Sequence, residues 1–95
     1  MAVKVLIKRK VVDKKAPELE ALLRKMRALT LNQKGYISGE TFTRIDEPEV
    51  SMVISSWQTL DDWRAWTLSK ERIEVQEQID KLLGAPTHYE VFENA

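Results

Sequence analysis

The chain has 95 residues, no cysteine, and 15 Lys and Arg residues against 15 Asp and Glu residues. This length allows a single domain over residues 1–95, and a composition of 43% hydrophobic and 32% charged residues is typical of a folded globular chain. The zero net charge gives no electrostatic basis for binding nucleic acid or an anionic membrane, and the lack of cysteine excludes disulfides and thiolate metal sites.

Hydrophobic periodicity in the first half predicts a strand, a helix and a second strand. Residues Val3 to Val12 alternate aliphatic side chains with lysines, as in a strand. A helix is predicted to begin at Pro17 and to end before Gly35, which suits a left-handed cap. Tyr36 to Ile45 is predicted as the next strand. The apolar stripe of the helix consists of Leu19, Leu22, Leu23, Met26 and Leu29.

A third strand is predicted from Val50 to Trp57. The loop before it contains Pro48, at a place where no backbone N–H is needed for strand pairing. Either Thr59 or Ser56 could cap the helix that follows. The apolar residues of this short helix form one stripe. They are Leu60, Trp63 and Trp66, continued by Thr67.

A further helical stretch is predicted from Lys70 to Leu83, with Ser69 as its cap, so a break before it would be a kink and not a long loop. Gly84, followed by a proline two residues later, predicts the helix end. Thr87 to Phe92 alternates again and is predicted as the fourth strand.

The resulting βαββαβ order is that of the ferredoxin-like α+β fold, a four-stranded antiparallel sheet with helices on one face. The third strand nevertheless places apolar residues on both of its sides, Ile54 on one and Val53 on the other. A large apolar patch left in water is unusual for a monomer. We therefore expect two copies to stack their uncovered sheet faces as a homodimer.

Metal and hydrolase chemistry find little support in the sequence. His88 is the single histidine, so neither a pair of histidine ligands nor a facial triad can form. Acidic residues on the predicted helices are typical of a solvated face. No serine lies in a nucleophile-elbow context, and three glycines are too few for a phosphate loop. We expect no bound metal.

Three tryptophans, Trp57, Trp63 and Trp66, fall within ten residues. Their spacing favours core packing, because each ring buries a large area. The alternative is an aromatic pocket between helices and sheet with a few polar groups aimed inward. Gln76, one turn after Ile73, would supply a neutral amide to such a pocket.

Two segments carry a resemblance to a known family. Residues 35–41 (GYISGET) and 57–66 (WQTLDDWRAW) resemble the antibiotic biosynthesis monooxygenase (ABM) domain, and residues 69–72 and 87–92 extend the similarity over essentially the whole chain. This resemblance implies a dimeric α/β barrel, built from two ferredoxin-like subunits with their sheets face to face. It thus agrees with the homodimer expected from the two-sided strands.

The resemblance also covers haem-degrading enzymes, which use a tryptophan and, ten residues later, an axial histidine. Trp66 matches the tryptophan, but Gln76 stands at the ligand position and the first strand lacks their asparagine. Because a carboxamide is a poor haem ligand, haem degradation of that type is the less favoured reading.

The reaction that the resemblance favours is a cofactor-independent oxidation of a small aromatic or quinol-type metabolite by O2. Trp66, Gln76 and His88 are the expected catalytic residues, with His88 the side chain best suited to move protons near neutral pH. The expected pocket lining is Phe42, Trp63 and Ile73. The alternative is a non-catalytic dimer that binds a small ligand or serves a stress-related role. No membrane-spanning run or export signal is visible, so we expect a cytoplasmic protein.

Overall fold

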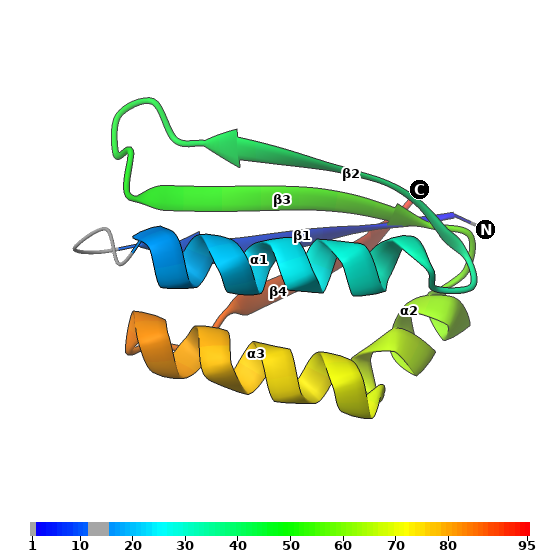
Figure 1. The fold of residues 1–95 in the computed structure, drawn as a ribbon. Coiled ribbons are helices and arrows are strands. Elements are labelled where there is room, and N and C mark those ends of the chain that lie inside the picture. Colours follow the sequence, from blue (N-terminus) through cyan, green and yellow to red (C-terminus); the bar gives the residue numbers. More distant parts are fainter. Residues whose placement is uncertain (1, 12–15) are drawn as a thin grey trace.

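The computed structural model describes residues 2–11 and 16–95, and it confirms the predicted α+β order (Figure 1). The predicted third strand and the long third helix have the boundaries that the sequence indicated. The elements are β1 (Val3–Lys10), α1 (Ala16–Leu31), β2 (Tyr36–Thr43), β3 (Val50–Trp57), α2 (Leu60–Thr67), α3 (Lys70–Leu83) and β4 (His88–Glu93).

The four strands form one antiparallel sheet in the order β2-β3-β1-β4, and the three helices lie together on one face of it (Figure 1). In β1 the odd-numbered residues face the helices, because Val3 and Val5 are buried and stand opposite Trp57 and Ser55 of β3. The even-numbered residues of β1 therefore belong to the uncovered face.

Several element ends differ from the prediction. Strand β1 ends at Lys10, and Val12 lies outside the described residues. Strand β2 ends at Thr43, and the side chain of Arg44, the next residue, pairs with Asp46 in the loop at 2.6 Å. Helix α1 ends at Leu31, so the positive φ of 83° at Gly35 belongs to the following turn and not to the helix cap.

Of the two residues that could cap α2, Thr59 does so, and the predicted cap of α3, Ser69, is confirmed. The Thr59 hydroxyl accepts the backbone N–H of Asp62 at 3.0 Å, and the Ser69 hydroxyl accepts that of Arg72 at 3.5 Å. Each hydroxyl satisfies a helix donor that has no partner within the helix. Gly84 ends α3 in the left-handed conformation, at a φ of 71° that an L side chain rarely adopts.

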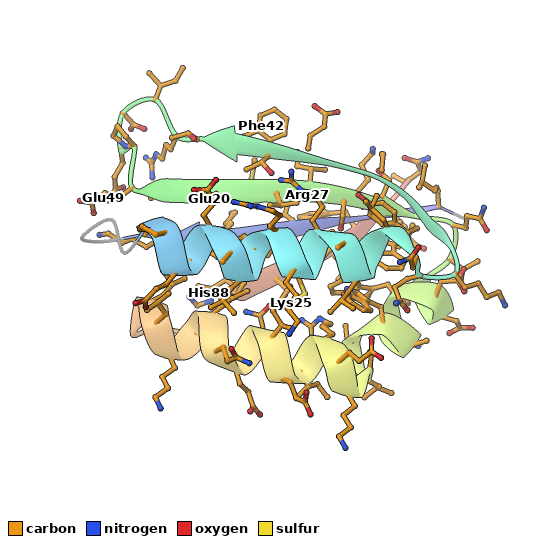
Figure 2. The ribbon with its side chains drawn as sticks, in the orientation of Figure 1. Glu20, Lys25, Arg27, Phe42, Glu49 and His88 are labelled. Carbon is orange, nitrogen blue, oxygen red and sulfur yellow. The ribbon has the colours of Figure 1, made fainter. Side chains whose placement is uncertain are left out.

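Two buried clusters hold the helices on the sheet. One joins β1 and β3 to α2 through the tryptophans, and the other joins α1 to α3 through Leu19, Val75 and Ile79. The uncovered face keeps large apolar groups at its surface, among them Phe42 and Phe92. Figure 2 shows Phe42 on the side of β2 turned away from the helices.

None of the helices formed by residues 16–31, 60–67 and 70–83 is long and apolar enough to cross a membrane.

Candidate functional site

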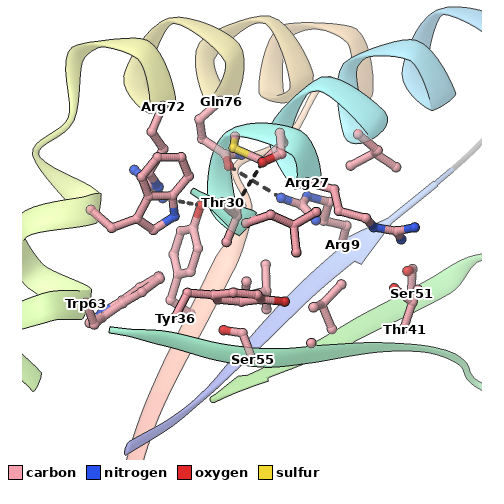
Figure 3. A pocket seen from close by; sticks show the side chains of 18 of the residues that line it. Arg9, Arg27, Thr30, Tyr36, Thr41, Ser51, Ser55, Trp63, Arg72 and Gln76 are labelled. Atoms are coloured by element: carbon pink, nitrogen blue, oxygen red, sulfur yellow. Dashed lines mark hydrogen bonds between the residues drawn. The ribbon is translucent and has the colours of Figure 1, made fainter. Parts of the chain in front are cut away.

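A cavity of about 470 Å³ lies between the sheet and its helices (Figure 3). Its floor is the covered face of β1, β2 and β3, and its remaining walls come from α1, α2, α3 and β4. The covered face is therefore not packed throughout. The pocket that the sequence left as an alternative to simple core packing is present, and the tryptophans serve both purposes.

The aromatic wall of the cavity is built around Trp57, the last residue of β3, which is 1% exposed. Its ring meets Tyr36 edge-on at a centroid distance of 5.4 Å, meets Trp63 edge-on at 5.8 Å and stacks with Trp66 at 6.5 Å. Its indole N–H donates to the Ser55 hydroxyl at 3.2 Å. These contacts pack the rings against one another into a continuous aromatic wall.

Tyr36 reaches this wall because of two irregularities in β2. A register shift between Tyr36 and Ser38 puts Tyr36 opposite Trp57. The Tyr36 hydroxyl then lies across Gly39, at 2.6 Å from the place that a Cβ on Gly39 would occupy. A side chain at Gly39 would therefore push the Tyr36 ring out of the cavity wall.

Arg72 and Tyr89 form the polar corner beside the tryptophans. Arg72 is 8% exposed, and its guanidinium donates to the Tyr89 hydroxyl at 2.7 Å and to the Thr67 carbonyl at 3.3 Å. The same guanidinium lies 6.0 Å from the Trp63 ring and 5.3 Å from the Tyr89 ring. Burial raises the pKa of the Tyr89 phenol, although the charges of Arg72 and Arg9 oppose this shift. Tyr89 therefore keeps its proton at neutral pH.

A second polar network joins Gln76 and Thr87 to Arg9 and Asp80. Gln76 donates its amide hydrogens to Asp80 and Thr87, both at 2.8 Å, and accepts from Arg9 at 3.4 Å. Thr87 in turn donates to Asp80 at 2.8 Å and accepts from Arg9 at 3.3 Å. These bonds hold the Arg9 guanidinium in place, and Figure 3 shows the one between Gln76 and Arg9.

The structure brings three of the predicted site residues to the cavity, namely Trp63, Trp66 and Gln76. The other three are not among its lining residues. His88 stands opposite Lys8, an even-numbered residue of β1, and so lies on the uncovered face of the sheet. Phe42 is on the same face and 41% exposed, and Ile73 is 39% exposed on α3. The residue type suggested a proton carrier at His88, but the strand register points it away from the cavity.

Sequence reasoning missed Arg9, Arg72 and Tyr89. In the sequence Arg9 is one of several basic residues on an alternating strand, and Arg72 is one of several charges on an amphipathic helix. A weak signal did exist for Arg9, because the strand's other basic residues are at even-numbered positions and Arg9 falls on the apolar side. No comparable signal marks Arg72.

The cavity residues do not fit a haem ligand set. Gln76 has both of its amide hydrogens and its oxygen engaged by protein groups, and His88 lies on the other side of the sheet. Residues 2–11 and 16–95 also contain no cluster of three or more His, Asp or Glu side chains placed to hold a metal ion.

The family model described as antibiotic biosynthesis monooxygenase matches residues 2–78. No curated protein matches the chain. Among solved structures, a conserved protein from Methanosarcina mazei Go1 superimposes with a TM-score of 0.89 at 19% identity, over 100% of this chain and 94% of that one.

Two further structures have the same fold. SnoaB, a cofactor-independent oxygenase from Streptomyces nogalater, gives a TM-score of 0.84 at 16% identity over 99% of this chain and 93% of its own. Rv0793 from Mycobacterium tuberculosis gives a TM-score of 0.84 at 18% identity, over 100% of this chain and 96% of its own. At such identities the likeness shows the fold, and any activity must be argued from the site.

Proposed function

Since this chain belongs to the antibiotic biosynthesis monooxygenase family, we propose that it oxidises a small aromatic or quinol-type metabolite with O2 and without a cofactor. One observation carries the proposal. The cavity is walled by aromatic rings and has at one corner a protonated phenol, Tyr89, backed by the Arg72 guanidinium at 2.7 Å. A flat electron-rich ring suits this shape, and an oxygen atom that becomes negative suits this corner.

The substrate itself supplies the electrons that reduce O2, so the reaction needs no external reductant. For an anthrone-type substrate, a ring CH2 loses a proton to water, and the resulting enolate passes one electron to O2. The substrate radical and superoxide combine into a C–O bond, and protonation gives a hydroperoxide. Loss of the remaining C–H proton and cleavage of the O–O bond release water and leave a C=O group. One oxygen atom enters the substrate and the other leaves as water.

In this scheme Arg72 and Tyr89 hold the enolate oxygen. The Tyr89 hydroxyl already accepts from Arg72, so its own hydrogen is free to point at the substrate. Stabilising the enolate lowers the pKa of the substrate C–H, which makes the first step feasible near neutral pH. Trp63 and Trp66 position the ring. Gln76 is a positioning residue, because its amide holds Arg9.

Oxygen uptake with a panel of anthrones and hydroquinones tests the proposal. We expect uptake with the wild type, and a fall in kcat of about a hundredfold in Tyr89→Phe, because the enolate loses a hydrogen-bond donor. Trp66→Phe and Gln76→Ala should lower the rate less. Arg44→Gln is the matched control, since Arg44 is an exposed arginine of the β2–β3 loop that pairs with Asp46.

Equal rates in the wild type and in Tyr89→Phe, Trp66→Phe and Gln76→Ala would refute the proposed site. Absence of uptake with every substrate would favour the alternative, a dimer that binds a small ligand without turning it over.

We also propose that the active form is a homodimer with the uncovered sheet faces in contact. Leu6, Met52 and Ile54 are only half-buried on this face, and Phe92 is 52% exposed. The family resemblance supports the same assembly. Burying such a patch against a second copy removes apolar surface from water, at roughly 25 cal/mol per Å².

A further inference from the structure

The cavity has two chemically different ends. Trp57, Trp63 and Trp66 wall one end. The other end is lined by Arg9 with hydroxyl residues of the sheet floor, Ser51 and Thr41. Arg9 and Ser51 stand directly opposite each other across β1 and β3, so both point into the cavity from the covered face. In Figure 3 Arg9, Arg27, Ser51 and Thr41 lie together, away from Trp63.

Among the described residues, the hydrogen-bond partners of the Arg9 guanidinium are all neutral. Its Nε donates to the Thr87 hydroxyl at 3.3 Å and its Nη2 to the Gln76 amide oxygen at 3.4 Å. Within residues 2–11 and 16–95, none of the ion pairs formed within 4.0 Å includes Arg9, Arg27 or Arg72. By contrast, the exposed Arg44 reaches both Asp46 and Glu47.

A largely buried arginine without an acidic partner in the part of the chain that the structure describes carries a desolvation cost. Burial lowers the pKa of Arg9. The nearby Tyr89 phenol and Asp80 carboxylate oppose this shift, and the Arg72 charge adds to it. Asp80 reaches Arg9 only through Gln76 and Thr87, which accept from Arg9 and donate to Asp80. Among the described residues, the cavity lining includes Arg9, Arg27 and Arg72 and no Asp or Glu, and Asp80 is the one carboxylate that contacts the network. The described lining therefore carries an excess of positive charge. Buried charges in proteins are normally paired.

We infer that the cavity takes an aromatic carboxylic acid, with its carboxylate at Arg9 and Ser51 and its ring system against the tryptophans. The inference rests on the proposed function and names the substrate class for it. A carboxylate accepts from the guanidinium and from the Ser51 hydroxyl, and so supplies the missing negative charge. Arg27, which lines the cavity from α1, would draw the acid toward it. The other end of the same substrate then reaches Arg72 and Tyr89, where the enolate oxygen forms.

The inference can be tested by calorimetric titration with 2-naphthoate and its neutral analogue 2-naphthamide. These two probes share the ring system and differ in charge. We expect the wild type to bind naphthoate at least about tenfold more tightly than naphthamide, which is the size of one charge-assisted hydrogen bond. Arg9→Gln should bring the ratio close to one, and added salt should lower it.

Arg24→Gln is the matched control, because Arg24 is an exposed arginine on α1 that pairs with Glu20 at 3.2 Å. It should keep the wild-type ratio. Arg9→Lys, which keeps the charge and loses the planar fork, should keep part of the preference. The wild-type ratio tests the inference even if a variant at Arg9 fails to fold.

Equal affinity of the wild type for the two probes, or no binding of naphthoate at millimolar concentration, would overturn the inference. So would a folded Arg9→Gln protein that keeps the full preference for the acid. If the wild type oxidises neutral anthrones but shows no preference for naphthoate over naphthamide, this inference is wrong and the proposed reaction stands. If the wild type prefers naphthoate but takes up no oxygen with any substrate, the binding site stands and the proposed reaction is wrong.

Discussion

The two faces of the sheet are made by the same strands but differ in burial within the subunit. On the covered face Val5 is 0% and Trp57 1% exposed, whereas Phe42 and Phe92 on the uncovered face are 41% and 52% exposed. Side-chain alternation puts apolar residues on both faces, and the three helices cover one of them. Strand composition alone therefore does not say which apolar residues form the core of the subunit.

The covered face itself changes character along its length. Toward the end of β3 the aromatic rings pack against one another, while Arg9 and Ser51 face the cavity at the other end. The chain thus keeps a hollow, charged region beside its most tightly packed residues. Binding sites placed next to a rigid core hold their groups in position without a rearrangement.

The largest effect is expected from the covered face. Trp57→Ala should lower the free energy of unfolding by about 3–5 kcal/mol, because a buried ring with three aromatic neighbours is replaced by a void. Denaturant unfolding measures this change. Leu68→Ala, at a residue 78% exposed, should change the stability by less than about 0.5 kcal/mol. Similar losses for the two variants would mean that Trp57 is not a core residue.

The second prediction concerns the uncovered face. The wild type should run at twice the chain mass of 11.0 kDa in light scattering, and Ile54→Glu should bring the particle to the mass of one chain, because a buried carboxylate opposes the contact.

The matched control for Ile54→Glu is Ile45→Glu, at a loop residue that is 98% exposed, and it should remain a dimer. A wild type that runs as a single chain would contradict the proposed assembly.

The smallest effect is expected from the pH dependence of stability. The pKa of Tyr89 is raised in the folded protein, so the fold holds this proton more tightly than the unfolded chain does. This contribution is fully present below about pH 10 and is lost as the pH rises through the folded-state pKa. The free energy of unfolding should therefore fall more steeply above about pH 10 in the wild type than in Tyr89→Phe. Urea titrations over this range measure the difference, and parallel curves would contradict it.

Much of the fold followed from local sequence. Ser69 and Gly84 cap α3 as predicted, and Thr59 caps α2 as one of the two candidates, because caps depend on groups a few residues apart. The ends of β1 and β2 were less predictable, because they depend on pairing with other strands. The site was only partly predictable. The tryptophan spacing pointed to Trp63 and Trp66. The strand register turns Arg9 toward the cavity and His88 to the uncovered face, and residue type alone does not determine that register.

The sequence by itself determined the order of strands and helices and the presence of an aromatic cluster, because these rest on local periodicity and on groups close in the chain. It also indicated the helix caps and the family, because these rest on neighbouring groups and on shared residue patterns. Only the tertiary structure decided that a cavity remains beside the tryptophans and that Arg9, Arg72 and Tyr89 meet there. Those residues are far apart in the chain, and strand register and helix packing bring them together.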